Sequence, residues 1–267
     1  MQKIDYCYHT HTTRCSHAIG TDEEYVLEAI KAGLKVIGFS DHVFLPGLSQ
    51  PNIRGNHSQL DEYVASIRAL KEKYKDQIEI LVGFEAEYLE EFIPYYQELL
   101  QSGKIDYLIQ GQHIYLDNHE IRWYFVNKDD EEKIELYLTH LIKGMETGLF
   151  SYIAHPDFFA SGMTHWSEFA TNITKRLCEA AVKYDVPLEF NLGGFRYPYE
   201  KFYPGKNNLR YPSMDFWKIV SEYPVKVFIG PDAHRPNVVS DDKEIEFALN
   251  KVKELNLNLQ TRINKKY

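Results

Sequence analysis

Short apolar segments alternate with amphipathic segments along most of the chain. The apolar segments are rich in β-branched and aromatic residues, and they lie at 4–9, 35–40, 78–84, 106–111, 151–155, 187–191 and 225–230. Runs of this kind predict strands that are buried on both faces, as in a parallel sheet covered by helices.

Helical patterns fill the intervals between these runs. Thr21 and Glu24 form a capping box at the start of one predicted helix, Gly33 ends it, and Ser58 opens the next helix. Three apolar faces recur at helical spacing: Leu60, Tyr63, Val64, Ile67 and Leu70; Ile134, Leu138, Leu141, Ile142 and Met145; Ile173, Leu177, Ala180, Ala181 and Tyr184. Seven strands alternating with helices predict an α/β fold, and they fit an incomplete or seven-stranded barrel better than an eight-unit barrel. An open doubly wound sheet is the alternative.

Composition narrows the class of protein further. The 267 residues suffice for one large domain or two small ones, and the formal net charge of −9 disfavours a non-specific nucleic-acid binder. No apolar run is long enough to span a membrane, and no secretory signal is visible. The three cysteines (Cys7, Cys15 and Cys178) form no C-x-x-C motif. We therefore expect a cytoplasmic protein without a disulfide framework or a membrane partner.

Polar residues gather at the carboxyl ends of the predicted strands, where parallel α/β folds carry their chemistry. In chain order these residues are His9, His11 and His17; Asp41 and His42; Glu85 and Glu87; His113; His155 and Asp157; Asn191; Asp232 and His234. Seven of the eleven histidines thus lie at one predicted rim. Seven protonated rings would repel one another, whereas neutral imidazole is a common metal ligand.

The spacing of these residues indicates a centre with several metal ions. Alternate residues of an extended segment point to one face, so His9 and His11 can converge on one ion, and Asp232 and His234 repeat the same spacing. Glu85 can bridge two ions, an arrangement that clamps a phosphoryl group and activates water. No thiolate joins the set, which argues against a structural zinc site.

The order H-x-H, downstream His, S-D-H, G-x-E, a central His, A-H-P and G-x-D-x-H resembles the polymerase and histidinol phosphatase (PHP) family. The motifs extend from His9 to His234, and the segments "GFEAEY" and "GQHIY" are most similar to histidinol-phosphate phosphatases of bacterial histidine biosynthesis. The resemblance implies a single domain over residues 1–267, folded as a distorted seven-stranded (β/α)7 barrel with its metal site at the C-terminal ends of the strands.

The same resemblance implies three divalent ions, which are zinc, manganese or iron in the family. The implied ligands are His9, His11, Glu85 and Asp232 for one ion, Glu85, His113 and His155 for the second, and His17, His42 and His234 for the third. The implied reaction is hydrolysis of L-histidinol phosphate, a phosphomonoester, to L-histidinol and inorganic phosphate by a metal-bridging hydroxide.

Further residues are candidates for catalysis or substrate binding. Asp41 is a candidate general acid or an orienter of His42, and Arg196 is the favoured phosphate contact, with Arg235, Arg14 and Arg54 as lesser candidates. Glu87 is a candidate partner for the substrate amine, and Asn191 a candidate substrate contact.

Other functions compete with this interpretation. A 3′–5′ exonuclease or other phosphodiesterase of the family is one alternative, and a phosphatase for another small phosphomonoester is a second. A metal-binding barrel without turnover and an amidohydrolase-type enzyme are weaker alternatives.

Overall fold

A parallel sheet curls through the middle of the molecule. The computed structural model describes residues 3–124, 130–161, 163–196 and 209–264. One part of the sheet has the order β1 (Tyr6–Cys7), β2 (Val36–His42), β3 (Glu79–Ala86) and β4 (Tyr107–Gln110), and the other has the order β7 (Leu188–Asn191), β8 (Lys226–Gly230) and β9 (Asn258–Leu259). All neighbouring pairs in both parts are parallel. The predicted α/β class is therefore confirmed.

Single-residue bridges join the two parts of the sheet. Ile153 pairs with Gln110 at the end of β4 and with Leu188 at the start of β7, and Thr10 pairs with Ala233 after β8. The strand ladders consequently do not close into a continuous barrel in the described chain. The predicted strand at 151–155 was wrong as a ladder strand, because the chain turns at His155, which has a φ of 32°, and Pro156 follows.

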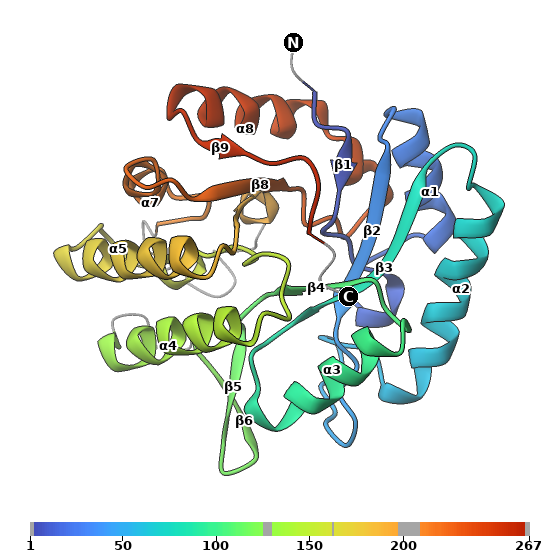
Figure 1. Cartoon of the computed structure of the whole chain (residues 1–267), viewed down its shortest axis with the longest axis horizontal. Coiled ribbons are helices and arrows are strands. Elements are labelled where there is room, and N and C mark those ends of the chain that lie inside the picture. The colour runs from blue at the N-terminus through green and yellow to red at the C-terminus, as the bar shows by residue number, and fades with distance from the viewer. Residues whose placement is uncertain (1–2, 125–129, 162, 197–208, 265–267) are drawn as a thin grey trace.

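Helices surround the sheet (Figure 1). They are α1 (Asp22–Lys31), α2 (Leu60–Lys73), α3 (Ile93–Gln101), α4 (Glu131–Thr147), α5 (Glu168–Lys183), α7 (Met214–Val220) and α8 (Asp242–Glu254). Short 3₁₀ segments lie at Thr13–Cys15, His57–Gln59, Glu90–Phe92, Phe158–Ala160, Gly193–Phe195 and Pro236–Ser240. The predicted capping box is present, since Thr21 accepts from the Glu24 N–H and the Glu24 side chain accepts from the Thr21 N–H. No helix among the described residues is long and apolar enough to cross a membrane.

The strands are buried on both faces, as their composition predicts. On β3, Ile80 and Val82 pack with residues of α1, α2 and α3, whereas Leu81 packs into a second cluster on the opposite face. That second cluster contains Tyr107, which lies against Gly38 and Gly83 so closely that a Cβ at either glycine would overlap its ring. This face is thus filled by aromatic side chains.

The strand predictions missed a hairpin and a short edge strand, and the helical faces named from the sequence did not include α3, α7 or α8. An antiparallel hairpin of β5 (Ile114–Asp117) and β6 (Glu120–Trp123) projects beside α4 (Figure 1). Its turn places Asn118 and His119 at positive φ, as a two-residue hairpin turn requires. The short edge strand β9 is the other addition.

Candidate metal centre

The segment after β1 pairs with the segment after β8, and this pairing brings the sequences His9-Thr10-His11 and Asp232-Ala233-His234 side by side. The Thr10–Ala233 bridge is held by the His11 N–H donating to the Ala233 carbonyl and the Ala233 N–H donating to the His9 carbonyl. The residues on either side of each bridge residue point to the same side. His9 and His11 therefore face Asp232 and His234.

Glu85 is the carboxylate on which most histidines of the site converge. It is 1% exposed at the end of β3, where it pairs in register with His42 of β2. Five imidazole nitrogens lie near its two oxygens: His155 Nε2 at 2.7 Å, His42 Nδ1 at 3.1 Å, His11 Nε2 at 3.5 Å, His113 Nε2 at 3.6 Å and His9 Nε2 at 3.7 Å. Gly111 leaves the space for this carboxylate, because a Cβ there would overlap it.

Asp232 is a second carboxylate that lies close to several histidines of the site. Its Oδ1 lies 3.4 Å from His11 Nε2, 3.6 Å from His9 Nε2 and 3.4 Å from His234 Nδ1. Gly193 makes room for it in the way that Gly111 makes room for Glu85. Asp232 itself has a φ of 51°, and strained backbone of this kind clusters at functional sites.

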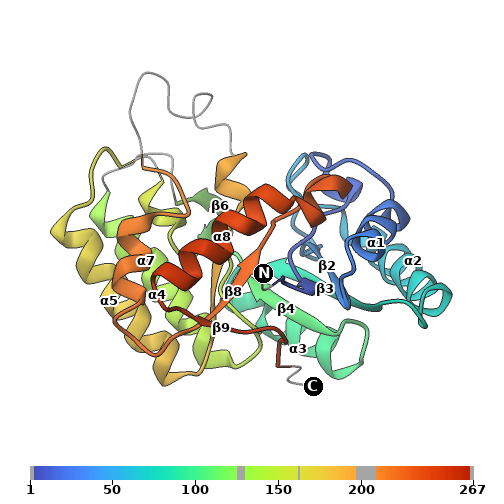
Figure 2. The same cartoon turned by 90° about the horizontal axis from the view of Figure 1, so that it is seen from above.

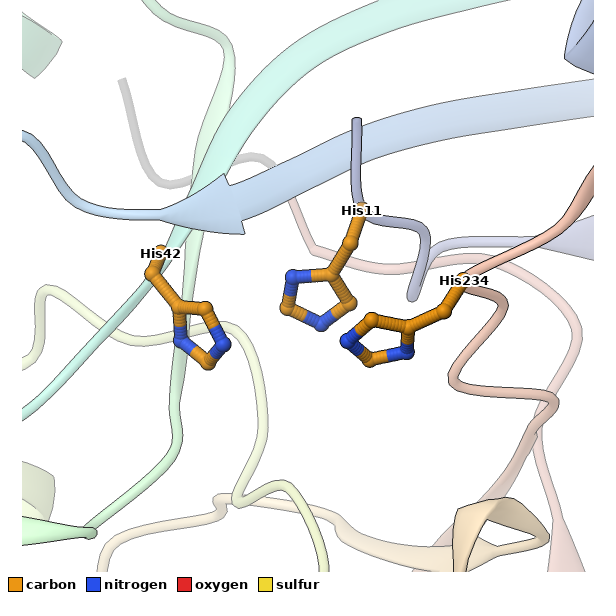
Figure 3. A group of neighbouring side chains, drawn as sticks. All are labelled: His11, His42 and His234. Carbon is orange, nitrogen blue, oxygen red and sulfur yellow. The ribbon is translucent and has the colours of Figure 1, made fainter. Parts of the chain in front are cut away.

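Several groups of side chains have the geometry to hold a metal ion. Within each group the candidate ligand atoms lie within 4.8 Å of one another. Three groups hold only predicted ligands: His9, His11 and Asp232; His11, His42 and His234; and His42, Glu85 and His113. Two others include Cys15, with His17 and His234 or with His11 and Asp41, although the sequence predicted a set without a thiolate. Figure 3 shows the rings of His11, His42 and His234 gathered from three different segments. The His11 and His234 rings stack with centroids 4.1 Å apart, and the His17 ring lies 4.7 Å from that of His234.

The donor atoms fit a divalent ion chemically. His9 Nε2 and Asp232 Oδ1 face each other, are buried, and have no hydrogen-bond partner among the described residues. Buried polar atoms without partners are costly, and a cation between them would satisfy both. Nitrogen and carboxylate oxygen are ordinary ligands for zinc and related metals.

The side chains of the site shift one another's pKa values. Burial alone lowers the pKa of His11, but the nearby carboxylates of Asp232, Asp41 and Glu85 outweigh it and raise the pKa to about 9. Burial and the neighbouring His11 charge lower the pKa of His234 to about 3 and that of His42 well below 6.5. Burial raises the pKa of Glu85, yet the charges of His113, His9 and His42 hold it well below the usual range. The cluster thus keeps Glu85 and Asp232 ionised. Its rings divide into two sets, because the pKa is raised for His9, His11 and His155 and lowered for His17, His42 and His234.

Asp41 lies behind the histidines and is fully buried. One oxygen accepts from the Thr12 N–H and hydroxyl, and the other accepts from the His42 N–H at 3.0 Å and lies 3.7 Å from His11 Nδ1. These contacts are those of a residue that orients its neighbours.

The predicted substrate contacts are largely engaged within the protein. Arg14 pairs with Asp22 and Glu62, and Asn191 donates to Glu189 and accepts from the Gly193 N–H. Arg196 pairs with Glu244 and donates to the Pro231 carbonyl. Arg235, by contrast, is exposed next to His234.

Arg54 and Glu87 form a buried ion pair at 2.8 Å, and Glu87 also lies 3.3 Å from His113 Nδ1. Glu87 is 1% exposed and already paired with Arg54, so it is not a free carboxylate for the substrate amine that the sequence suggested as its partner. The buried Arg54 also anchors the loop at 43–57 through the Val43 carbonyl and Gln50.

One residue that contacts the site was missed in the sequence. Glu189 on β7 is fully buried and binds the ring of His9. Its signal was a carboxylate inside the apolar run "PLEFN", where a buried strand would otherwise carry only apolar side chains.

Comparisons with known proteins agree with this geometry. A family model described as "PHP domain" matches residues 8–192. A protein of Deinococcus radiodurans is 29% identical over 240 residues, covering 86% of each chain, and one of Schizosaccharomyces pombe is 26% identical over 255 residues, covering 86% of this chain and 81% of the relative. Both are named "Probable histidinol-phosphatase".

A solved structure has the same fold. It is a histidinol phosphate phosphatase from Lactococcus lactis, in complex with zinc, L-histidinol and phosphate. The TM-score is 0.70 at 20% identity, and the alignment covers 98% of this chain and 99% of that one. At this identity the likeness shows the fold alone.

Proposed function

Because the chain belongs to the PHP domain family, we propose that it is a metal-dependent phosphatase and that its substrate is L-histidinol phosphate. The observation that carries this proposal is the convergence of five imidazoles on the buried carboxylate of Glu85. The names of the relatives support the choice of substrate. We further infer that residues 1–267 form one domain.

The chain's own residues divide into three sets of ligands. His9, His11, Glu85 and Asp232 would hold one ion, Glu85 with His113 and His155 a second, and His17, His42 and His234 the third. When bound, such ions supply positive charge for the phosphoryl oxygens and lower the pKa of water towards neutrality. Three divalent ions would outweigh the two anionic ligands, so the site would attract a phosphate monoester although the chain's net charge is −9.

Other residues would position the substrate and its surroundings. Asp41 would hold His11 and His42 in place, since both of its oxygens already accept hydrogen bonds. Arg235 is the best-placed described candidate for a phosphate contact, because it is exposed and directly follows a ligand. Arg196 would first have to leave Glu244.

Phosphate release tests the proposal. Metal-loaded protein is assayed on L-histidinol phosphate, p-nitrophenyl phosphate and the diester bis-p-nitrophenyl phosphate, before and after treatment with a chelator. We expect kcat/KM for histidinol phosphate to exceed that for the generic monoester by orders of magnitude, and we expect chelation to abolish turnover. Preference for the diester would replace the proposed substrate with a nucleic acid. Turnover that survives complete metal removal would refute the metal-dependent reaction.

A further inference from the structure

Glu189 contacts His9 from behind the metal centre. Its carboxylate is fully buried on β7, and its two oxygens lie 2.9 and 3.1 Å from His9 Nδ1. This contact crosses the sheet from β7 to the segment that follows β1. The orientation of the His9 ring therefore depends on a residue far away in the sequence.

Other groups hold the Glu189 carboxylate in place. The His155 N–H donates to Oε2 at 3.1 Å, and Asn191 Nδ2 donates to the same oxygen at 2.7 Å. On the other side, Gly230 leaves room for Oε1, since a Cβ at that position would overlap it. Three segments that carry predicted ligands or site residues thus meet at one carboxylate.

The opposite nitrogen of His9 faces the centre. Nε2 lies 3.7 Å from Glu85 Oε1 and 3.6 Å from Asp232 Oδ1, and it has no hydrogen-bond partner among the described residues. Glu189 belongs to none of the described groups whose ligand atoms lie close enough to share an ion. Glu189 can therefore act on an ion only through the candidate ligands that it contacts, and His9 is the one whose ring it binds.

A second carboxylate–histidine contact in the site differs in charge. Glu87 lies 3.3 Å from His113 Nδ1, but it is also paired with Arg54 at 2.8 Å, which neutralises it. In the described chain the partners of Glu189 are His9, a main-chain N–H and an amide, with no lysine or arginine. No described lysine or arginine therefore neutralises Glu189, and its carboxylate can act on the His9 ring alone.

We propose that Glu189 is a positioning residue of the metal centre, which fixes the proton of His9 on Nδ1, directs Nε2 at the ion and strengthens metal binding by that ring. A carboxylate behind a ligating histidine raises its basicity, and loss of such a partner typically weakens metal affinity roughly 10–100-fold. This inference rests on the proposed function, because it requires that His9 bind metal.

Zn²⁺ affinity measured by competition with a fluorescent chelator tests the inference. We compare the wild-type chain with Glu189→Gln, which keeps the shape and removes the charge, and with Glu135→Gln, which removes a half-exposed carboxylate of α4 that pairs with Arg176 of α5. We expect Glu189→Gln to weaken the tightest Zn²⁺ site roughly 10–100-fold while the control stays at the wild-type value. Equal affinities for Glu189→Gln and wild type would overturn the inference.

A double mutant tests whether the effect passes through His9. In a His9→Ala background, Glu189→Gln should cause no further loss of Zn²⁺ affinity. An equally large loss in that background would mean that Glu189 acts on the fold in general, and the inference would be wrong. Circular dichroism of the metal-free variants checks that each is folded.

The wild-type chain provides a readout that does not depend on any variant folding. In the Zn²⁺-loaded protein, long-range ¹H–¹⁵N NMR should show His9 protonated on Nδ1 and metal-bound through Nε2. A proton on Nε2 would overturn the inference even if the metal is bound elsewhere. A wild-type chain that binds no Zn²⁺, Mn²⁺ or Fe²⁺ would overturn the proposed function, and this inference with it.

Discussion

The two parts of the sheet hold their site residues in different ways. On the ladder side, formed by β1 to β4, strands β2 and β3 are paired in register from Val36–Glu79 to His42–Glu85. On the bridged side, formed by Ile153 and β7 to β9, strands β7 and β8 also form a ladder, but His155 and Asp232 lie next to the single bridges at Ile153 and Ala233. Figure 2 shows α1 and α2 beside the first side and α4, α5 and α7 beside the second.

The backbone of the site residues reflects this difference. His42 and Glu85 are the last or nearly the last residues of regular strands. His155 follows the single bridge at Ile153 and Asp232 precedes the one at Ala233, and their φ values are 32° and 51°. Side-chain hydrogen bonds support the turn at His155, because Glu189 accepts from the His155 N–H and Asp157 accepts from the Ser213 N–H at 2.6 Å.

This difference predicts which substitutions should lower the stability of the fold and which should weaken metal binding. Ladder residues are positioned by the same hydrogen bonds that hold the sheet together, so damage there should reduce the free energy of unfolding. Residues of the bridged side are positioned by a few buried polar groups and by the space that glycines leave for them. Substitutions of these residues should therefore weaken metal binding while the protein stays folded.

The largest effect is expected at Glu85, where both sides meet. Glu85→Gln removes the charge that faces His42 from the ladder side and His155 from the bridged side. We expect kcat/KM to fall by more than the roughly 100-fold that marks the upper range for outer-sphere partners, with loss of bound metal. Elemental analysis and phosphate release measure both. Glu79→Gln, at the exposed start of the same strand, serves as the control, and full metal content in Glu85→Gln would contradict the prediction.

A pair of glycine substitutions separates the two sides directly. Gly38→Ala forces a Cβ against Tyr107, whose hydroxyl donates to the Tyr8 carbonyl at 2.7 Å, and should lower the free energy of unfolding by about 1–3 kcal/mol. Gly230→Ala forces a Cβ against Glu189 and should weaken Zn²⁺ binding. Urea denaturation and chelator competition are run on both variants. If Gly38→Ala strips metal while the chain stays folded, the proposed division between the two sides fails.

Two arginines on the bridged side sharpen the comparison. Arg235→Ala should lower kcat/KM for the phosphomonoester about 10–100-fold, the range expected for a lost charged hydrogen bond of about 1.5–3 kcal/mol. Arg196→Ala should have a smaller effect, because Arg196 pairs with Glu244 and the Pro231 carbonyl. Steady-state kinetics of both variants decide between them. A larger loss for Arg196→Ala would favour Arg196 as the phosphate contact, as the sequence predicted.

The smallest effect is expected for His140 of α4, at the junction of the two sides. Its carbonyl accepts a hydrogen bond from the side chain of Gln110 on β4. Burial and the charge of Lys143 lower the pKa of His140 to about 4. Between pH 4 and 6.5 the unfolded chain binds a proton there that the folded chain does not, so this group's contribution to stability rises with pH and is lost as pH falls.

The variant His140→Gln removes this titration. The difference in free energy of unfolding between wild type and variant should change between pH 6.5 and pH 4 and stay constant above pH 7. Denaturant unfolding of the metal-free proteins at a series of pH values measures it. A difference that is independent of pH throughout would show that His140 does not titrate in this way.

Much of the architecture could be predicted from local patterns. The apolar runs marked β2, β3, β4, β7 and β8, and the capping box at Thr21 marked the start of α1. The segment at 151–155 failed because its apolar run is cut short by the turn at His155. The β5–β6 hairpin was missed because its strands are half exposed and short, so they lack a strong apolar pattern.

The candidate site divides in the same way. The types and spacing of its inward-facing residues could be read from the sequence because strand alternation is local, as the two motifs around Thr10 and Ala233 show. The partners behind those residues could not. Arg54 and Glu87 are 33 residues apart, and His9 and Glu189 are 180 residues apart.

The sequence by itself therefore determined the α/β class, the start of α1 and a set of candidate residues for holding metal, because each follows from local periodicity and side-chain chemistry. Only the tertiary structure decided which charges are neutralised, which arginines are engaged and which glycines leave room for carboxylates. These features depend on contacts between segments that are distant in the sequence, and such contacts are decided by how the strands pair and by which atoms then compete for the same buried space.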